Sequence, residues 1–185
     1  MSAQKNDLLR VRQAYENLIK ALTFIRVYNL QESDFKARED DLDLDKLSAV
    51  CTVYLYVSRM VEELSKISID TCFLYRDIHW DEIRGMRNRM IHAYFSFDNS
   101  FIWKVLTVTD YKEVAGFCQD FALAQGYELP DLESAIEDRI KHGNRDDRAT
   151  ELDSVSTNAI LANRAQKETS KPTIAVEQPI VGDEL

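Results

Sequence analysis

An arginine, an asparagine, a histidine and a tyrosine lie close together in the stretch RNRMIHAY, from Arg87 to Tyr94. A histidine can move protons near neutral pH, because its ordinary pKa lies close to that pH. An arginine can hold a phosphate and stabilise the negative charge that develops there during a reaction. Arg87 and His92 would therefore suit RNA cleavage through the 2′-hydroxyl, which DNA lacks. The same spacing also fits a histidine at a polar surface or one satisfied within a core.

One helix should carry these residues, running from Trp80 to about Phe97, with Asp81 and Glu82 at its positive N-terminal end. At about 100° per residue, one side should face the core, formed by Ile83, Met86, Met90 and Phe97. The opposite side should be polar and exposed, formed by Gly85, Asn88, His92 and Ser96. Gly85 would let another chain approach this face closely.

Arg84 and Arg89 flank the polar face and are candidate substrate-binding residues. No acidic residue lies between Ile83 and Phe97, so the helix should form a basic region on an acidic protein. Arg87 lies about 140° from His92 around the same helix. The two could converge if the arginine side chain arches round, if the helix distorts, or if a second subunit completes the site. We favour a homodimer.

Composition restricts the fold and the function. The chain has 185 residues, a net charge of −9, and few turn formers, with 5 Gly and 3 Pro, which favours an all-α class. A protein that coats nucleic acid without specificity would be basic. Cys51, Cys72 and Cys118 are expected to be free core thiols in a reducing cytosol, and no metal-ligand spacing is present. No apolar run approaches the ~18 residues of a membrane span, so a cytoplasmic protein is expected.

Apolar spacings of three and four residues predict the helices that must position the motif. We expect long helices over 7–29, about 47–64, 80–97 and 110–126, and short ones within 67–78, over 101–108 and over 131–142. Capping residues Asp110 and Glu113 should open the fourth long helix, and Gly126 should end it. An antiparallel, four-helix-type bundle with short extra helices follows. We divide the chain into a helical domain 1–128, a short helix 129–142 and a polar tail 143–185 expected to be mostly disordered.

The apolar side of the first long helix should be formed by Leu8, Val11, Tyr15, Leu18, Leu22 and Ile25. That of the second should be formed by Leu47, Val50, Tyr54, Val57, Val61 and Leu64. Between these helices, Gln31 to Asp45 is rich in acids. It is expected to be a solvated loop, or alternatively a docking surface for a basic partner.

The residues around the motif resemble a known family. Trp80, Ile83, the run Gly85 to Asn88, Ile91, His92, Tyr94, Phe95, Asp98, Ile102 and Trp103 are similar to the signature of HEPN proteins. More narrowly, they resemble HepT-type toxins, which pair with minimal nucleotidyltransferase antitoxins. The similarity extends over 7–125. It departs in the second helix, where family members often carry Gly-Glu-Ala and this chain has RMVEE from Arg59 to Glu63, with only Glu62 in common.

The resemblance implies a metal-independent endoribonuclease that acts as a homodimer, with its motif helices facing each other across a cleft. By position, Arg87 and His92 would be catalytic and Asn88 would support their geometry. Tyr94 matches the tyrosine that the antitoxin modifies with AMP from ATP, so the chain itself needs no cofactor. Alternatively, Arg87 could form a structural ion pair and Tyr94 could pack in the core. The whole chain could then be a non-catalytic helical module that docks or positions a nucleotidyltransferase.

Overall fold

The computed structural model describes residues 3–37, 41–92, 100–107 and 110–142. Over these ranges the chain forms helices and no strand, which confirms the predicted all-α class. The helices are α1 (Ala3–Val27), α2 (Glu32–Lys36), α3 (Leu44–Ser65), α4 (Ile69–Leu74), α5 (Trp80–His92), α6 (Ser100–Thr107), α7 (Asp110–Ala124) and α8 (Leu132–His142). The helical residues predicted beyond His92, up to Phe97, lie outside the described ranges.

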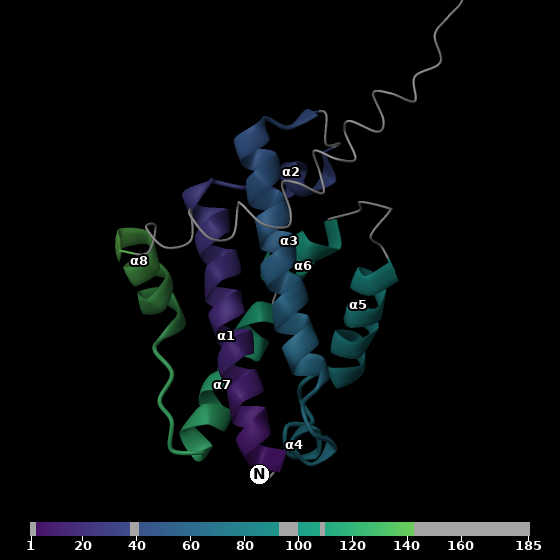
Figure 1. Cartoon of the computed structure of the whole chain (residues 1–185), viewed down its shortest axis with the longest axis vertical. Helices are drawn as coiled ribbons and strands as arrows, with labels where there is room; N and C mark the ends of the chain where they lie inside the picture. Colours follow the sequence, from purple (N-terminus) through teal and green to yellow (C-terminus); the bar gives the residue numbers. More distant parts are fainter. Residues whose placement is uncertain (1–2, 38–40, 93–99, 108–109, 143–185) are drawn as a thin grey trace, which may run out of the picture.

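The long helices α1 and α3 run antiparallel through the middle of the molecule (Figure 1). Helix α5 packs on α3, whereas α7 and α8 pack on α1. Among the short helices, α2 packs beside α6 in the upper half of the bundle and α4 lies at its lower end (Figure 1). The antiparallel bundle with short extra helices is therefore the observed architecture.

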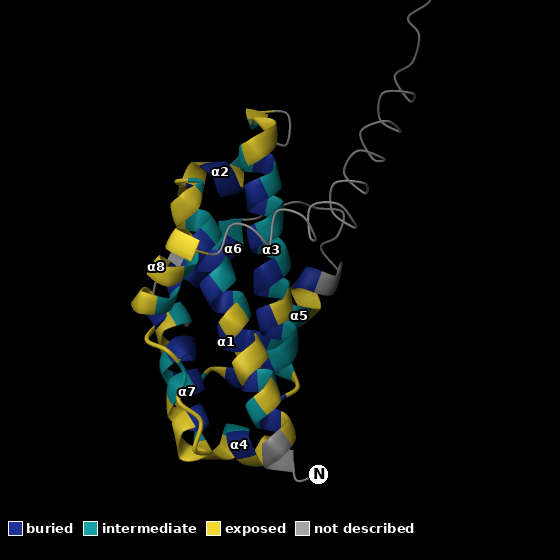
Figure 2. Cartoon of the chain, turned by 60° about the vertical axis from the view of Figure 1, so that its left-hand side comes forward, coloured by how far each residue is buried: buried dark blue, intermediate teal, exposed yellow. Residues whose placement is uncertain are grey.

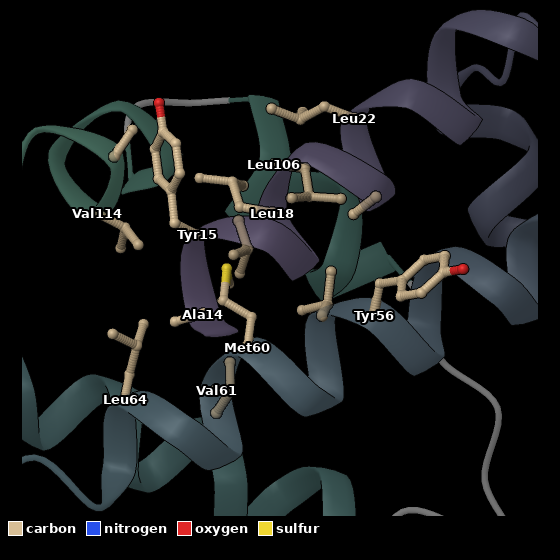
Figure 3. Close-up of a cluster of buried hydrophobic side chains, with 14 of the residues drawn as sticks. Ala14, Tyr15, Leu18, Leu22, Tyr56, Met60, Val61, Leu64, Leu106 and Val114 are labelled. Atoms are coloured by element: carbon tan, nitrogen blue, oxygen red, sulfur yellow. The ribbon is translucent and has the colours of Figure 1, made fainter. Parts of the chain in front are cut away.

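The core forms where α1 and α3 meet. Figure 3 shows Leu18 of α1 and Met60 of α3 directed toward each other, and both are almost fully buried. Buried residues line the inner sides of the helices and exposed ones the outer sides (Figure 2). The predicted stripes are confirmed for their buried members, which are Val11, Tyr15, Leu18, Leu22, Leu47, Val50, Val57, Val61 and Leu64. Leu8 and Ile25 are only partly buried against this core.

Helix α8 is tied to α1 by apolar and polar contacts. Its Leu132 and Ile136 belong to the same core cluster, and Arg139 pairs with Glu16 at 3.1 Å. Just before α8, the Pro130 carbonyl accepts a hydrogen bond of 2.8 Å from the Tyr15 hydroxyl. Burial raises the pKa of Tyr15 to about 12. The segment 129–142 thus packs on the bundle, and the division of the chain at 128 stays a prediction.

Gly126 ends α7 as predicted. Its φ of 77° lies in the left-handed region that glycine adopts without steric cost. The Gly126 N–H donates to Leu123 O at 2.9 Å and the Tyr127 N–H to Ala122 O at 2.9 Å, the paired bonds of a Schellman motif. The buried apolar side of α7 ends before this turn, since Val114, Phe117 and Phe121 are buried but Ala124 is exposed.

The acidic stretch from Gln31 to Asp45 is not a continuous solvated loop, so that expectation is wrong. It contains α2, whose first turn is closed by Gln31 and Asp34 in a capping box. Asp34 is buried and pairs with Lys46 at 2.9 Å, which offsets the cost of burying its charge. The Gln31 and Lys46 donors hold the pKa of Asp34 below its ordinary value despite the opposing effect of burial.

None of the three cysteines forms a disulfide, as predicted, but only Cys118 is a buried core residue. Burial raises the pKa of the Cys118 thiol. Cys51 and Cys72 are half-buried, so the expectation that all the cysteines are core residues is wrong.

A buried carboxylate fixes the corner between α3 and α4. Asp7 of α1 is buried and accepts hydrogen bonds from the Ser68 N–H, the Ser68 hydroxyl and the Thr71 hydroxyl. Ser68 is also the N-cap of α4, where it accepts from the Thr71 N–H. The N-terminal part of α1 thereby holds the connection that leads into α5.

Candidate functional site

Helix α5 is fixed on the bundle by its apolar side. Ile83 and Met90 are buried and Met86 packs against the core, as predicted. Trp80 anchors the start of the helix, because its indole N–H donates to Tyr75 O at 2.9 Å. Its ring also meets Phe117 of α7 edge to face, with centroids 5.0 Å apart and planes at 87°.

Three polar residues of α3 contact α5, and we call Tyr54, Ser58 and Glu62 the α3 polar stripe. They recur every four residues and therefore share one side of the helix. The Tyr54 hydroxyl donates to Met90 O at 3.1 Å, and the Ser58 hydroxyl lies 3.8 Å from the Met90 sulfur. Glu62 Oε2 accepts from Arg87 Nε at 2.7 Å. The placement of Tyr54 in the apolar stripe is confirmed in part, since its half-buried side chain packs against the core while its hydroxyl bonds to α5.

The contact of Tyr54 supports the end of α5 next to His92. The Tyr54 hydroxyl, on α3, donates to the Met90 carbonyl of α5. This bond holds the backbone two residues before His92.

Arg87 forms an ion pair with Glu62, while Lys66 holds the other carboxylate oxygen, Oε1, at 2.9 Å. The hydrogen bond from Arg87, followed by that from Lys66, lowers the pKa of Glu62. Glu62 is thus a carboxylate at neutral pH. The Arg87 side chain remains 40% exposed, so a ligand can still reach it.

The outer side of α5 is open, as predicted for its described residues. Gly85, Asn88 and Arg89 are exposed, and a Cβ added at Gly85 would meet no atom within 4 Å. Arg84 is half-buried and lies 3.5 Å from both Asp81 Oδ1 and Cys72 Sγ. The expectation of a purely basic region needs correction, because Arg84 and Arg87 each have an acidic neighbour.

A family model for ribonucleases of the HepT-like type matches residues 18–121, more than half of the chain. The chain belongs to the HepT-like ribonuclease family. The resemblance inferred from the sequence is confirmed at this level. The matched region includes α3 with its polar stripe and the whole of α5. No curated protein and no solved structure gave a significant match.

Of the site residues proposed for this HepT-like chain, the structure describes the side chains of Arg84, Arg87, Asn88 and Arg89. His92 is the last residue of α5, but its side chain lies outside the described residues, as does Tyr94 altogether. The convergence of Arg87 with His92, and the core-packing alternative for Tyr94, therefore stay predictions.

Sequence reasoning on this HepT-like chain missed two parts of the site, Tyr54 and Lys66. A usable signal was present, because Tyr54, Ser58, Glu62 and Lys66 form a polar series at four-residue intervals beside the apolar stripe of α3. Such a series on a helix buried on its other sides indicates a polar contact with a neighbouring helix.

Two further observations concern metals and membranes. Within residues 3–37, 41–92, 100–107 and 110–142, no three His, Cys, Asp or Glu side chains gather as a metal site would require. None of the described helices combines the length and the apolar character needed to cross a membrane.

Proposed function

We propose that this chain is a toxin-like, metal-independent endoribonuclease that cleaves RNA by attack of a 2′-hydroxyl on the adjacent phosphate. The observation that carries the proposal is that the ribonuclease-family match includes α5, where Glu62 holds Arg87 and leaves its guanidinium partly exposed. The substrate class and the ATP-using partner proposed below both fit the cytoplasm.

In the proposed reaction, His92 either takes the proton of the 2′-hydroxyl while water protonates the leaving 5′-oxygen, or protonates that oxygen while water takes the first proton. The 2′-oxygen bonds to phosphorus, the bond to the 5′-oxygen breaks, and that oxygen leaves protonated. The products carry a 2′,3′-cyclic phosphate and a 5′-hydroxyl. Arg87 stabilises the charge on the phosphate oxygens, Arg84 and Arg89 bind the RNA backbone, and Asn88 supports the geometry.

A homodimer would bring Arg87 and His92 together even if they lie on different sides of α5, as ideal helix geometry predicts. Arg87 faces α3, where it meets Glu62, whereas ideal geometry places His92 about 140° away. The exposed Gly85 and Asn88 leave that side of α5 open to a second copy. Two motif helices facing each other could then form a cleft from both subunits.

The first prediction tests the reaction. Purified chain with unmodified Tyr94 should cleave an RNA oligonucleotide in the presence of EDTA and leave DNA of the same sequence intact. The products should carry 2′,3′-cyclic phosphate ends, detected by mass spectrometry. Arg87→Ala should lower the rate about 100-fold, since it removes the charge that stabilises the transition state. Wild-type chain without activity, or equal activity of Arg87→Ala, would contradict the proposal.

We also propose that a cognate minimal nucleotidyltransferase antitoxin regulates the chain by transferring AMP from ATP to the Tyr94 hydroxyl, with release of pyrophosphate. The added phosphate would block RNA through its negative charge and its volume. Tyr94 lies two residues after His92 in the sequence, so the modification would be close to the proposed proton-transferring residue.

The second prediction concerns this modification. Incubation with such an enzyme and ATP should raise the intact mass by one or more AMP units and abolish RNA cleavage. Peptide mapping should locate the AMP on Tyr94, and Tyr94→Phe should stay unmodified and active. Tyr111, a tyrosine on α7, provides the control Tyr111→Phe, which should still be modified. An unchanged mass with an active enzyme would reject the proposal.

A second candidate function is a non-catalytic module that docks a nucleotidyltransferase. The exposed acids around α2 and the start of α3 favour it, namely Glu32, Asp41, Asp43 and Asp45, because they suit a basic protein surface better than RNA. If this function holds, expression of the chain alone should be harmless to cells. Arg87→Ala should then change partner binding and no RNA-cleaving activity.

A further inference from the structure

We infer that Glu62 is a positioning residue, which holds Arg87 by its Nε–H and so presents the outer end of the guanidinium to a substrate phosphate. The inference rests on the proposed RNA-cleaving function and assigns to that site a residue on a different helix. It starts from the 2.7 Å contact between Arg87 Nε and Glu62 Oε2.

The shape of the Arg87 guanidinium allows it to bind Glu62 and a phosphate at the same time. This group is planar and carries five N–H donors, so two of them can grip a phosphate in parallel. Glu62 occupies the Nε–H, and among the described residues nothing else bonds to Arg87. The two terminal nitrogens are then the pair left for a phosphate, in an orientation that Glu62 fixes.

The charges of Arg87, Glu62 and Lys66 leave the site positive. A carboxylate beside a phosphate site would repel the substrate if it cancelled the arginine charge. Here Lys66 holds the other oxygen of Glu62 at 2.9 Å, so the three side chains together keep a net positive charge. Glu62 can therefore orient Arg87 without neutralising the site.

The packing of α3 against the core fixes the position of Glu62. Glu62 follows Val61 and precedes Leu64, and both are buried against the core of the bundle. The rotation of α3 about its axis is thus fixed by packing, and with it the side on which Glu62 lies. A charge held in place in this way needs little reorganisation during the reaction.

A partly exposed ion pair contributes little to the stability of the fold. Measuring stability beside activity therefore distinguishes a positioning role of Glu62 from a purely structural one. The Arg87 and Glu62 side chains are 40% and 35% exposed, and ion pairs in contact with water contribute little to folding. Loss of Glu62 should therefore leave the melting temperature almost unchanged while activity falls.

The third prediction follows. Glu62→Ala should lower kcat roughly ten- to a hundredfold, because a misplaced arginine no longer meets the developing charge. Glu62→Gln should recover part of this loss, since its amide oxygen can still accept the Nε–H. The matched control is Glu63→Ala, because Glu63 pairs with Arg10 at 3.9 Å and Lys66 at 3.7 Å. It should keep wild-type kcat, and equal losses in Glu62→Ala and Glu63→Ala would overturn the inference.

A double-mutant comparison tests whether Glu62 acts through Arg87. Lysine lacks the Nε–H and the planar fork, so its single ammonium cannot serve Glu62 and the phosphate in the same way. In the Arg87→Lys background, Glu62→Ala should cause no further loss of kcat. A loss as large as in the wild-type background would show that Glu62 acts independently and would overturn the inference.

A readout other than activity separates this inference from the proposed function. In ¹H–¹⁵N spectra, the Arg87 Nε–H should exchange slowly with water in wild-type chain and Glu63→Ala, and rapidly in Glu62→Ala. Unchanged exchange in Glu62→Ala would overturn the inference whatever the activity. Wild-type chain that shows slow exchange but cleaves no RNA would overturn the proposed function, and with it the role of Glu62 in positioning Arg87 for the reaction.

Discussion

Replacing His92 with alanine should reduce RNA cleavage by about 10²- to 10⁴-fold, the range that a proton-transferring side chain contributes. This is the fourth prediction. The fold should survive, because the described contacts that hold α5 involve other residues. Those contacts are the Tyr54 bond to Met90 O, the Arg87–Glu62 pair and the packing of Trp80. Rate constants on a defined RNA substrate, with circular dichroism as a check of folding, would measure the effect.

The chain supplies matched controls in its other histidines. His79 is exposed just before α5, and His142 is exposed at the end of α8. His79→Ala and His142→Ala should each cleave RNA at nearly the wild-type rate. If His92→Ala also cleaved at that rate, His92 would not transfer the proton and the proposed mechanism would be wrong.

Replacing Trp80 with alanine should destabilise the fold by about 3–5 kcal/mol, the usual cost of removing a buried tryptophan. This fifth prediction rests on the loss of three interactions. Trp80 is 8% exposed, and its indole meets Phe117 edge to face and donates to Tyr75 O. Since Trp80 joins α5 to α7, its removal should also loosen the helix that carries Arg87. Thermal and urea unfolding would measure the change, with a fall in Tm of roughly 10 °C.

Trp80→Phe separates the contributions at this position. It keeps an aromatic ring against Phe117 but loses the hydrogen bond to Tyr75, so its cost should be clearly smaller than that of Trp80→Ala. Arg89→Ala, on the exposed side of the same helix, should leave the free energy of unfolding nearly unchanged. A loss below 1 kcal/mol in Trp80→Ala would contradict the anchoring role.

The helices that pack along a continuous apolar side could be predicted from the sequence. The spacing of Val11, Leu18 and Leu22 defines α1 because burial of such a side dominates the free energy of folding. Helix α2 was missed because a helix of five residues shows no period, and its stability comes from Gln31, Asp34 and Lys46. Capping and ion pairs across a turn leave little trace in an apolar pattern.

The site was predicted in its composition but not in its contacts. The motif on α5 identifies Arg87, yet its partner Glu62 lies 25 positions earlier, on another helix. Pairing them requires knowing which side of α3 faces α5, and helical periodicity gives each helix a buried side without saying which neighbour covers it. The same limit hid the hydrogen bond of Tyr54 to α5, because a tyrosine in an apolar stripe can also reach a polar partner with its hydroxyl.

The four-residue interval of Tyr54, Ser58 and Glu62 makes the site sensitive to insertions in α3. One residue inserted between Ser58 and Glu62 would turn Glu62 by about 100° around the helix axis while Tyr54 stayed in place. The carboxylate would then leave the side that faces Arg87, although every side chain of the site was still encoded. Substitutions along this part of α3 change one contact each, whereas a change in its length would keep the contact at Met90 and remove the one at Arg87.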